Sequence, residues 1–419
     1  MKRYSWLCLL ILLAGCSSYT KKGTVIAGND VNQKTTISVL AGFSTNDAGL
    51  SEMISREVAE SFPQVELEWE NTDWGTTFSS TLRARLSVGD VPDIIVGKAQ
   101  DAVVYAKTGL LAAIPENVLQ CIDERYRSDT SVDTVTYGAV YNVAYQGIIY
   151  NKNMFWRYGL TVPRTKRELD SVVSRFESVG IIPFASHFQE DWFTANIMMQ
   201  FAINDLFTTQ PDWGIRFNNG ERSFETSHEM KNCFTNVKYI YAHSFPDSFI
   251  VQNSECDNRF IKEQSPMYLT GSWSVQAIHA VNSAMQIGIF PFPNEDGTAG
   301  LIVEPNLTFM KSASTAHEQL VDRIFELLFT DTEFAESVYS FTQSFPALKN
   351  MPMGYDSMIQ SDITAYADSG RLIDASVGNN QLIWNFQSGM AKEITKWLQN
   401  KQSIEQLASE CDKKRSDNK

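Results

Sequence analysis

The chain of 419 residues carries a formal net charge of −14, and 43% of its residues are hydrophobic. A surface with this much negative charge repels nucleic acid and anionic lipid headgroups. We therefore expect neither nucleic-acid binding nor a large anionic ligand. The apolar share is ordinary for a globular protein, and the length exceeds what one hydrophobic core holds, which predicts two domains.

The first residues have the pattern of an export signal. Lys2 and Arg3 precede an apolar run from Trp6 to Leu13, which is shorter than the roughly 20 apolar residues that span a bilayer. We expect residues 1–15 to be a signal peptide. The sequence LAGC at 13–16 resembles a bacterial lipobox, which implies acylation of Cys16. The alternative is an ordinary signal peptide with an incidental cysteine.

Residues 16–34 are rich in Ser, Thr, Lys, Gly and Asn and predict a flexible tether. After it, hydrophobic periodicity predicts a strand at 37–43, a helix at 50–62, a strand at 65–69, a helix at 78–86 and a strand at 94–96. This β-α-β-α-β order predicts a parallel sheet. Ligands of such sheets bind beyond the carboxyl ends of the strands, here at loops 44–49, 71–76 and 97–101.

The rest of the chain continues as an α/β pattern. Residues 137–150 are β-prone and lack turn residues, which predicts a strand that leaves one domain and enters the other, and 301–310 is a second candidate. Residues 267–278 predict a strand, a glycine turn and a helix, and 287–290 predict a further strand. Helical patterns occupy 168–179, 192–206, 320–341 and 394–407.

Motifs of catalysis and metal binding are missing from the sequence. It contains no GxSxG, P-loop or GxGxxG, and its five histidines lack metal-ligand spacing. We therefore predict no enzymatic activity, no cofactor and no metal. The acid pairs at 190–191 and 295–296 are typical of solvated turns. The cysteines at 121, 233, 256 and 411 form no CxxC, and sequence leaves open whether Cys233 pairs with Cys256 or all stay free thiols.

Tryptophans carry the strongest functional signal. Five of them fall in or near predicted loops and helix starts: Trp74, Trp192, Trp213, Trp273 and Trp384. Indoles stack on the apolar faces of sugar rings, while Asp, Asn, Gln and Glu side chains hydrogen-bond the hydroxyls. The pattern favours a neutral carbohydrate ligand, although a single tryptophan is more often a packing residue.

Four sequence motifs in the chain resemble those of a known protein family. GDVPDIIVG (89–97), YAKTGLLAAI (105–114), GIIYNKNMFWRYGLTVPRTKREL (147–169) and MYLTGSW (267–273) resemble the recurrent motifs of family 1 extracellular solute-binding proteins. These are the receptors of bacterial ABC sugar importers. The likeness is collinear from about Thr36 to Leu407. In the third motif, Thr165 and Glu168 also have the spacing of a helix capping box.

The resemblance implies the two-lobe type II periplasmic-binding-protein fold, of the α/β class, with a ligand cleft between hinged lobes. It places the crossings near 142–145, 300–305 and 345–349. The first lobe would comprise 35–142 plus 303–346. The second would comprise 143–302 plus 347–410, and 411–419 would form a tail.

The resemblance also implies site residues. EDWFT, GSW and LIWNF match segments in which the family's maltose-binding member carries tryptophans, which points to Trp192, Trp273 and Trp384 on the second lobe. The tryptophan that this member has after PDII is replaced here by Gly97-Lys98-Ala99-Gln100-Asp101, so Trp74 is the candidate to compensate. The expected hydroxyl partners are Gln100, Asp101, the loop residues Ser44, Asn46 and Asp47, and Glu304 on the crossing strand.

The resulting functional prediction is a monomeric substrate-binding lipoprotein that captures a neutral sugar or oligosaccharide and delivers it to ABC permease subunits. Its only membrane link would be the lipid on Cys16, at the outer face of the cell membrane, which is the extracellular side or, in an envelope with two membranes, the periplasmic side. Three alternatives remain open at this point. They are a receptor for an amine or peptide, a membrane-anchored glycan hydrolase, and a sensor or adhesin that keeps the receptor fold.

Overall fold

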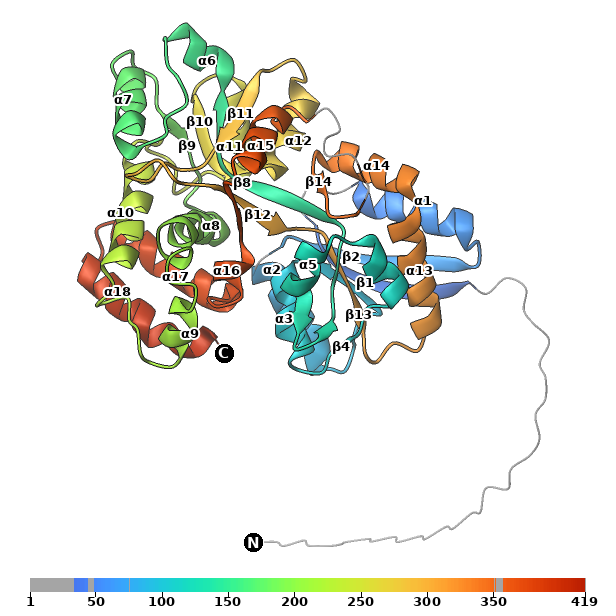
Figure 1. The fold of residues 1–419 in the computed structure, drawn as a ribbon. Helices are drawn as coiled ribbons and strands as arrows, with labels where there is room; N and C mark the ends of the chain where they lie inside the picture. Colours follow the sequence, from blue (N-terminus) through green and yellow to red (C-terminus); the bar gives the residue numbers. More distant parts are fainter. Residues whose placement is uncertain (1–33, 44–48, 75, 350, 352–356, 419) are drawn as a thin grey trace, which may run out of the picture.

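The chain forms two α/β lobes that lie side by side (Figure 1). The computed structural model describes residues 34–43, 49–74, 76–349, 351 and 357–418. The expected signal peptide, the tether up to residue 33 and the loop residues Ser44, Asn46 and Asp47 lie outside these ranges. Within the described ranges, no helix has both the length and the apolar character that crossing a membrane requires.

The first lobe is built on a sheet in the order β2-β1-β3-β13-β4, with β7 paired to β13. Its strands are β1 (Thr35–Gly42), β2 (Val65–Thr72), β3 (Ile94–Gly97), β4 (Leu111–Ala112), β7 (Ala139–Val140) and β13 (Thr308–Ser312). Strand β1 is parallel to both β2 and β3. Helices α1 (Leu50–Ser61) and α2 (Thr76–Ser87) connect them, which confirms the predicted β-α-β-α-β order.

The second lobe has the sheet β15-β12-β8-β10-β9, with β11 and β14 also paired to β8. Its strands are β8 (Asn142–Asn151), β9 (Phe184–Ala185), β10 (Met267–Gly271), β11 (Ile287–Phe290), β12 (Leu301–Pro305), β14 (Phe345–Pro346) and β15 (Leu372–Asp374). Strand β8 is buried along its whole length. Strands β10, β11, β12 and β14 all pair antiparallel with it, which places β8 inside the sheet.

Helices complete both lobes. The first holds α3 (Ala99–Ala106), α4 (Glu116–Cys121) and α5 (Glu124–Arg127), and a small hairpin of β5 (Ser131–Val132) and β6 (Val135–Thr136). The second holds α6 (Lys152–Arg157), α7 (Lys166–Glu177), α8 (Asp191–Ala202), α9 (Trp213–Asn218), α10 (His228–Ala242), α11 (Asn253–Ile261), α12 (Trp273–Val281), α15 (Gln360–Asp368) and α16 (Ser376–Asn379). The predicted capping box is present, since Thr165 caps α7 together with Glu168.

The three crossings between the lobes meet at Tyr141 and Asn142. The Tyr141 N–H donates to the Leu307 carbonyl at 2.7 Å, and the Tyr141 carbonyl accepts from the Ala347 N–H at 3.2 Å. The Asn142 side chain accepts from the Leu307 N–H at 2.8 Å and donates to Ser344 Oγ at 2.7 Å. All three connections are thereby tied to one another, as a shared hinge requires.

The crossing points differ by a few residues from the expected boundaries. Residues 303–305 were expected in the first lobe, but β12 pairs with β8 of the second lobe as far as Pro305. Residues 347–349 were expected in the second lobe, yet the Lys349 N–H donates to the Cys121 carbonyl of the first lobe at 2.7 Å. Strand pairing, which a linear pattern does not reveal, sets these limits.

Two predicted helices are each divided in the structure. The pattern at 320–341 forms α13 (Glu318–Thr330) and α14 (Thr332–Thr342), because Asp331 between them accepts from the Phe334 N–H at 2.8 Å and caps the second helix. The pattern at 394–407 belongs to α17 (Trp384–Leu398) and α18 (Ile404–Lys413), where Ser403 forms a capping box with Gln406.

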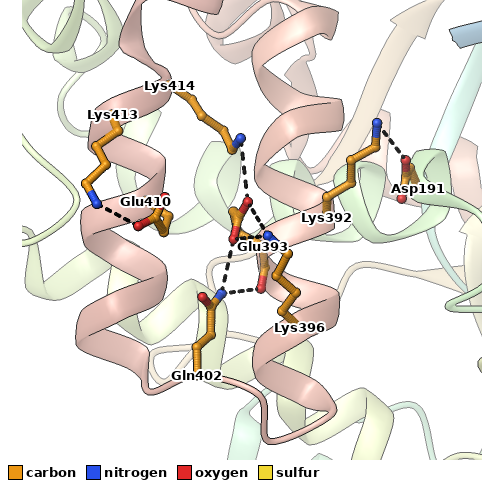
Figure 2. Close-up of polar contacts among 8 residues, drawn as sticks. All are labelled: Asp191, Lys392, Glu393, Lys396, Gln402, Glu410, Lys413 and Lys414. Carbon is orange, nitrogen blue, oxygen red and sulfur yellow. Dashed lines mark hydrogen bonds and ion pairs between the residues drawn. The ribbon is translucent and has the colours of Figure 1, made fainter.

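The expected tail at 411–419 is instead packed on the second lobe as far as it is described. Cys411 is fully buried in α18, and the Asn418 side chain accepts from the Ile383 N–H at 2.6 Å. Figure 2 shows the polar cluster that joins this region to α17. Its centre is the buried Glu393, which pairs with Lys396 at 3.0 Å and Lys414 at 3.5 Å.

Candidate ligand-binding site

A cavity of about 550 Å³ lies between the two lobes. The first lobe contributes the ends of β1 and β3 and the start of α3. The second lobe contributes the first turns of α8, α11, α12 and α17, together with α16. The crossing residues Asn142, Asn306 and Ser344 form part of the lining. The cavity therefore lies at the carboxyl ends of the parallel strands, where the strand order predicted a ligand.

Four of the five tryptophans line this one cavity. Trp192, Trp273 and Trp384 begin or nearly begin α8, α12 and α17 of the second lobe, and Trp74 precedes α2 in the first lobe. The fifth, Trp213, is only 2% exposed and stacks on Phe217 in the interior. Trp213 is therefore a packing residue of the second lobe and not a residue of the cavity lining.

The indoles form two pairs. Trp192 and Trp273 meet edge to face within the second lobe, with ring centroids 6.4 Å apart. The Trp192 Nε1–H donates to Glu190 Oε1 at 3.1 Å, which fixes the orientation of this ring. Trp74 and Trp384 meet across the cleft, with centroids 4.7 Å apart and an angle of 55° between the rings. The two pairs therefore differ in kind, because only the second joins the lobes.

Gln100 and Asp101 follow one another at the start of α3 but face different surroundings. Gln100 reaches the second lobe, where its Oε1 accepts from the Trp384 N–H at 2.6 Å and its Nε2 donates to the Asn379 carbonyl at 2.5 Å. Asp101 lies outside the cavity lining. Its Oδ2 accepts from the Trp74 Nε1–H at 3.4 Å and from the Lys98 N–H at 2.9 Å. Asp101 thus positions Trp74 and has no direct contact with the cavity.

Of the remaining residues predicted to bind sugar hydroxyls, one lies in the cavity and three lie outside the described residues. Glu304 lines the cavity and accepts a hydrogen bond from the Gln146 side chain. Ser44, Asn46 and Asp47 fall outside the described residues, although the neighbouring Gly42 and Phe43 line the cavity.

The pair Glu190–Asp191 was expected in a solvated turn, and this expectation is wrong. Both residues line the cavity, and Glu190 Oε2 accepts from the Asn253 N–H at 2.8 Å. The other pair behaves as expected, since Asp296 accepts from Thr298 within an exposed turn.

Several polar groups that line the cavity were not predicted from the sequence. Asn253 and Asp257 lie on α11, while Asp129 of the first lobe and Asn379 of the second lobe also belong to the lining. The Asn253 side chain donates to Asp257 Oδ2 at 2.9 Å. The only signal for them was the polar composition of NSECDN at 253–258, which resembles many exposed helix starts.

The cavity is strongly acidic. Among the described residues, Lys98 is its one lysine or arginine, against the carboxyl groups of Asp73, Asp129, Glu190, Asp191, Asp257 and Glu304. Burial and the charge of Glu190 raise the pKa of Asp257 to about 7. Burial and the charge of Asp374 in the opposite lobe raise the pKa of Asp129. The excess of carboxyl groups over basic side chains in the lining disfavours an anionic ligand.

In the part of the chain that the structure describes, the cysteines form no disulfide and the possible metal ligands form no cluster. In the described ranges, no three His, Cys, Asp or Glu residues are arranged to hold a metal ion. Cys121, Cys233, Cys256 and Cys411 are free thiols, so the possible pairing of Cys233 with Cys256 is not formed.

Comparison with known proteins agrees with this architecture. A curated multiple sugar-binding protein of Streptococcus mutans is 24% identical over 368 residues, which cover 84% of this chain and 82% of that protein. The solved structure of the solute-binding protein RafE with raffinose aligns with a TM-score of 0.78 at 18% identity, covering 91% of this chain and 98% of that one. A chitin oligosaccharide binding protein aligns with a TM-score of 0.76 at 18% identity and the same coverage. Residues 44–333 match the family model for bacterial extracellular solute-binding proteins, and the chain belongs to that family.

Proposed function

We propose that this protein captures a neutral sugar or oligosaccharide between its lobes and delivers it to the permease of an ABC importer. One observation carries the proposal: four indoles from both lobes line a single cavity that is otherwise rich in carboxyl and amide groups. Flat indoles match the C–H faces of a sugar ring, and carboxylates and amides match its hydroxyls. The names of the similar proteins, which refer to raffinose, chitin oligosaccharide and multiple sugars, support the same ligand class.

The proposed cycle makes and breaks no covalent bond. The lobes close over the ligand about the hinge at Tyr141 and Asn142, and the closed form is favoured because the ligand contacts both lobes. The protein acts as a monomer that acyl chains on Cys16 hold at the outer face of the membrane. Exchange of Cys16 for Ser should release the protein from the membrane fraction. Retention of this variant in the membrane fraction would contradict the anchor.

A second candidate is an amine-bearing ligand. The six carboxyl groups of the described lining, which also holds the single lysine Lys98, favour it because they attract a cation. An ammonium group binds by charge and does not require an aromatic surface, whereas the cavity supplies two pairs of indoles.

A thermal-shift screen followed by calorimetry tests both candidates. The ligands are raffinose, stachyose, chitotriose and xylotriose, with glucosamine oligomers as the amine arm and galacturonic acid as the anion. A ligand at about 100 times its Kd stabilises the folded protein by about 2.7 kcal/mol, which a melting curve resolves. We expect a neutral sugar to bind and galacturonic acid to leave the melting curve unchanged. If only the amines bind, the second candidate replaces the first, and binding of none of the neutral sugars or amines would refute both.

A further inference from the structure

The contact between Trp74 and Trp384 bears on the length of the ligand, an inference that rests on the proposed function. Trp384 belongs to the second lobe and was expected to offer a face for stacking. It is instead 8% exposed. Its indole packs against Ala195 and Ala391 of its own lobe, with Trp192 beside them, and against Trp74 of the other lobe. The part of the Trp384 surface that faces the first lobe is therefore already covered by an aromatic ring of the protein, and only the remainder lines the cavity.

Trp74 is held in this place from several sides. Its Nε1–H donates to the buried Asp101 at 3.4 Å, and the Lys98 ammonium lies 5.2 Å from its ring centroid. Its pyrrole edge lies against Gly42, where even a single added methyl carbon would approach the ring to 2.9 Å. Glycine at the end of β1 thus makes room for this indole. Trp74 is fixed to the first lobe and meets Trp384 in the arrangement in which the lobes touch.

A sugar ring and an indole cannot occupy the same face. A ligand confined to the part of the cavity around Trp192 and Trp273 leaves the Trp74–Trp384 contact intact, so its binding keeps the direct contact between the lobes. A longer ligand that reaches Trp384 must first push Trp74 away. The protein then loses the contact between Trp74 and Trp384. The free energy of that contact is about as large as that of a sugar ring stacked on Trp384.

We propose that Trp74 is a specificity-determining residue that limits ligand length by occupying the stacking face of Trp384. The wild-type protein then prefers short oligosaccharides that end before Trp384. Gln100 is the natural comparison, because it also joins the lobes at Trp384, but its hydrogen bond is to the backbone N–H of that residue and not to the indole. Removing Gln100 loosens the contact between the lobes, whereas removing the Trp74 ring also frees the face.

The test is a length series measured by calorimetry. Chito-, xylo- and raffinose-series oligosaccharides of two to five rings are titrated into the wild type, Trp74→Ala, Trp74→Phe and Gln100→Ala. Trp156→Phe is the matched control, since Trp156 is 84% exposed on α6. Trp74→Ala should raise the affinity ratio of long to short ligands by about tenfold, the value of one stacked ring. Trp74→Phe should give a smaller increase, and Gln100→Ala should weaken all lengths alike.

The outcomes separate this inference from the proposed function. If sugars bind but Trp74→Ala leaves the length ratio unchanged, or changes it no more than Gln100→Ala does, the length limit is refuted and sugar binding stands. If the wild type already prefers the longest ligands, the inference is likewise wrong. If no sugar binds, the proposed function fails and the length limit with it. Circular dichroism verifies folding, and should Trp74→Ala not fold, Trp74→Phe decides the question.

Discussion

Gln100 offers the sharpest test of how the lobes are held together. Its side chain accepts from the Trp384 N–H and donates to the Asn379 carbonyl, both in the opposite lobe. The Trp384 N–H is one of the free donors at the start of α17, and Ile383 before it supplies no side-chain cap. A residue of the first lobe therefore caps a helix of the second lobe. Exchange of Gln100 for Ala removes both hydrogen bonds from the form in which the lobes touch.

The size of the effect follows from what happens when the lobes part. The donor and the acceptor then meet water, so each bond is worth its net value of about 0.5–1.5 kcal/mol. Two bonds amount to about 1–3 kcal/mol in favour of the open form. Because the open form must close to bind, this loss weakens ligand affinity by roughly 5- to 150-fold.

Calorimetry with the tightest sugar of the screen measures the affinity, and small-angle scattering of the ligand-free protein measures the opening. We expect a weaker Kd and a larger radius of gyration. Gln100→Glu keeps the acceptor for the Trp384 N–H but loses the donor to Asn379, and it should give an intermediate loss. Gln120→Ala, on the exposed face of α4, is the control. An unchanged Kd together with an unchanged scattering curve for Gln100→Ala would refute the reasoning.

Three further predictions concern single side chains. Trp273→Ala should weaken sugar binding by about 1–3 kcal/mol, the value of a stacking partner, and unchanged calorimetry would remove Trp273 from the site. Asp129→Asn should raise Tm at pH 8 more than at pH 5. The raised pKa of Asp129 in the folded state means that stability falls as the pH rises from about 4 towards neutrality, and equal shifts at both pH values would contradict this. Glu393→Ala should cost about 1–3 kcal/mol of unfolding free energy and speed hydrogen exchange in 404–418, because Lys414 loses its partner (Figure 2), whereas unaltered exchange would count against it.

Local sequence pattern predicted the backbone well. The strand at 94–96, the helix at 50–62 and the capping box of Thr165 with Glu168 all appear where expected. Each depends on residues within a few positions of one another, through side-chain periodicity or a short-range hydrogen bond. The division of 320–341 into two helices was within reach of the same reasoning, since Asp331 is a helix-capping residue.

Local sequence pattern could not predict which residues line the cavity. Trp213 and Trp384 each begin a helix, yet one is stacked on Phe217 in the interior and the other meets Trp74 of the opposite lobe. Asp101 turned away from the cavity, and Glu190 turned into it. These outcomes depend on contacts between residues far apart in the chain, which form only when two sheets and their three crossings pack together. Amino-acid pattern thus specifies which elements form and which chemistry is available, and long-range packing specifies which of those groups face the same space.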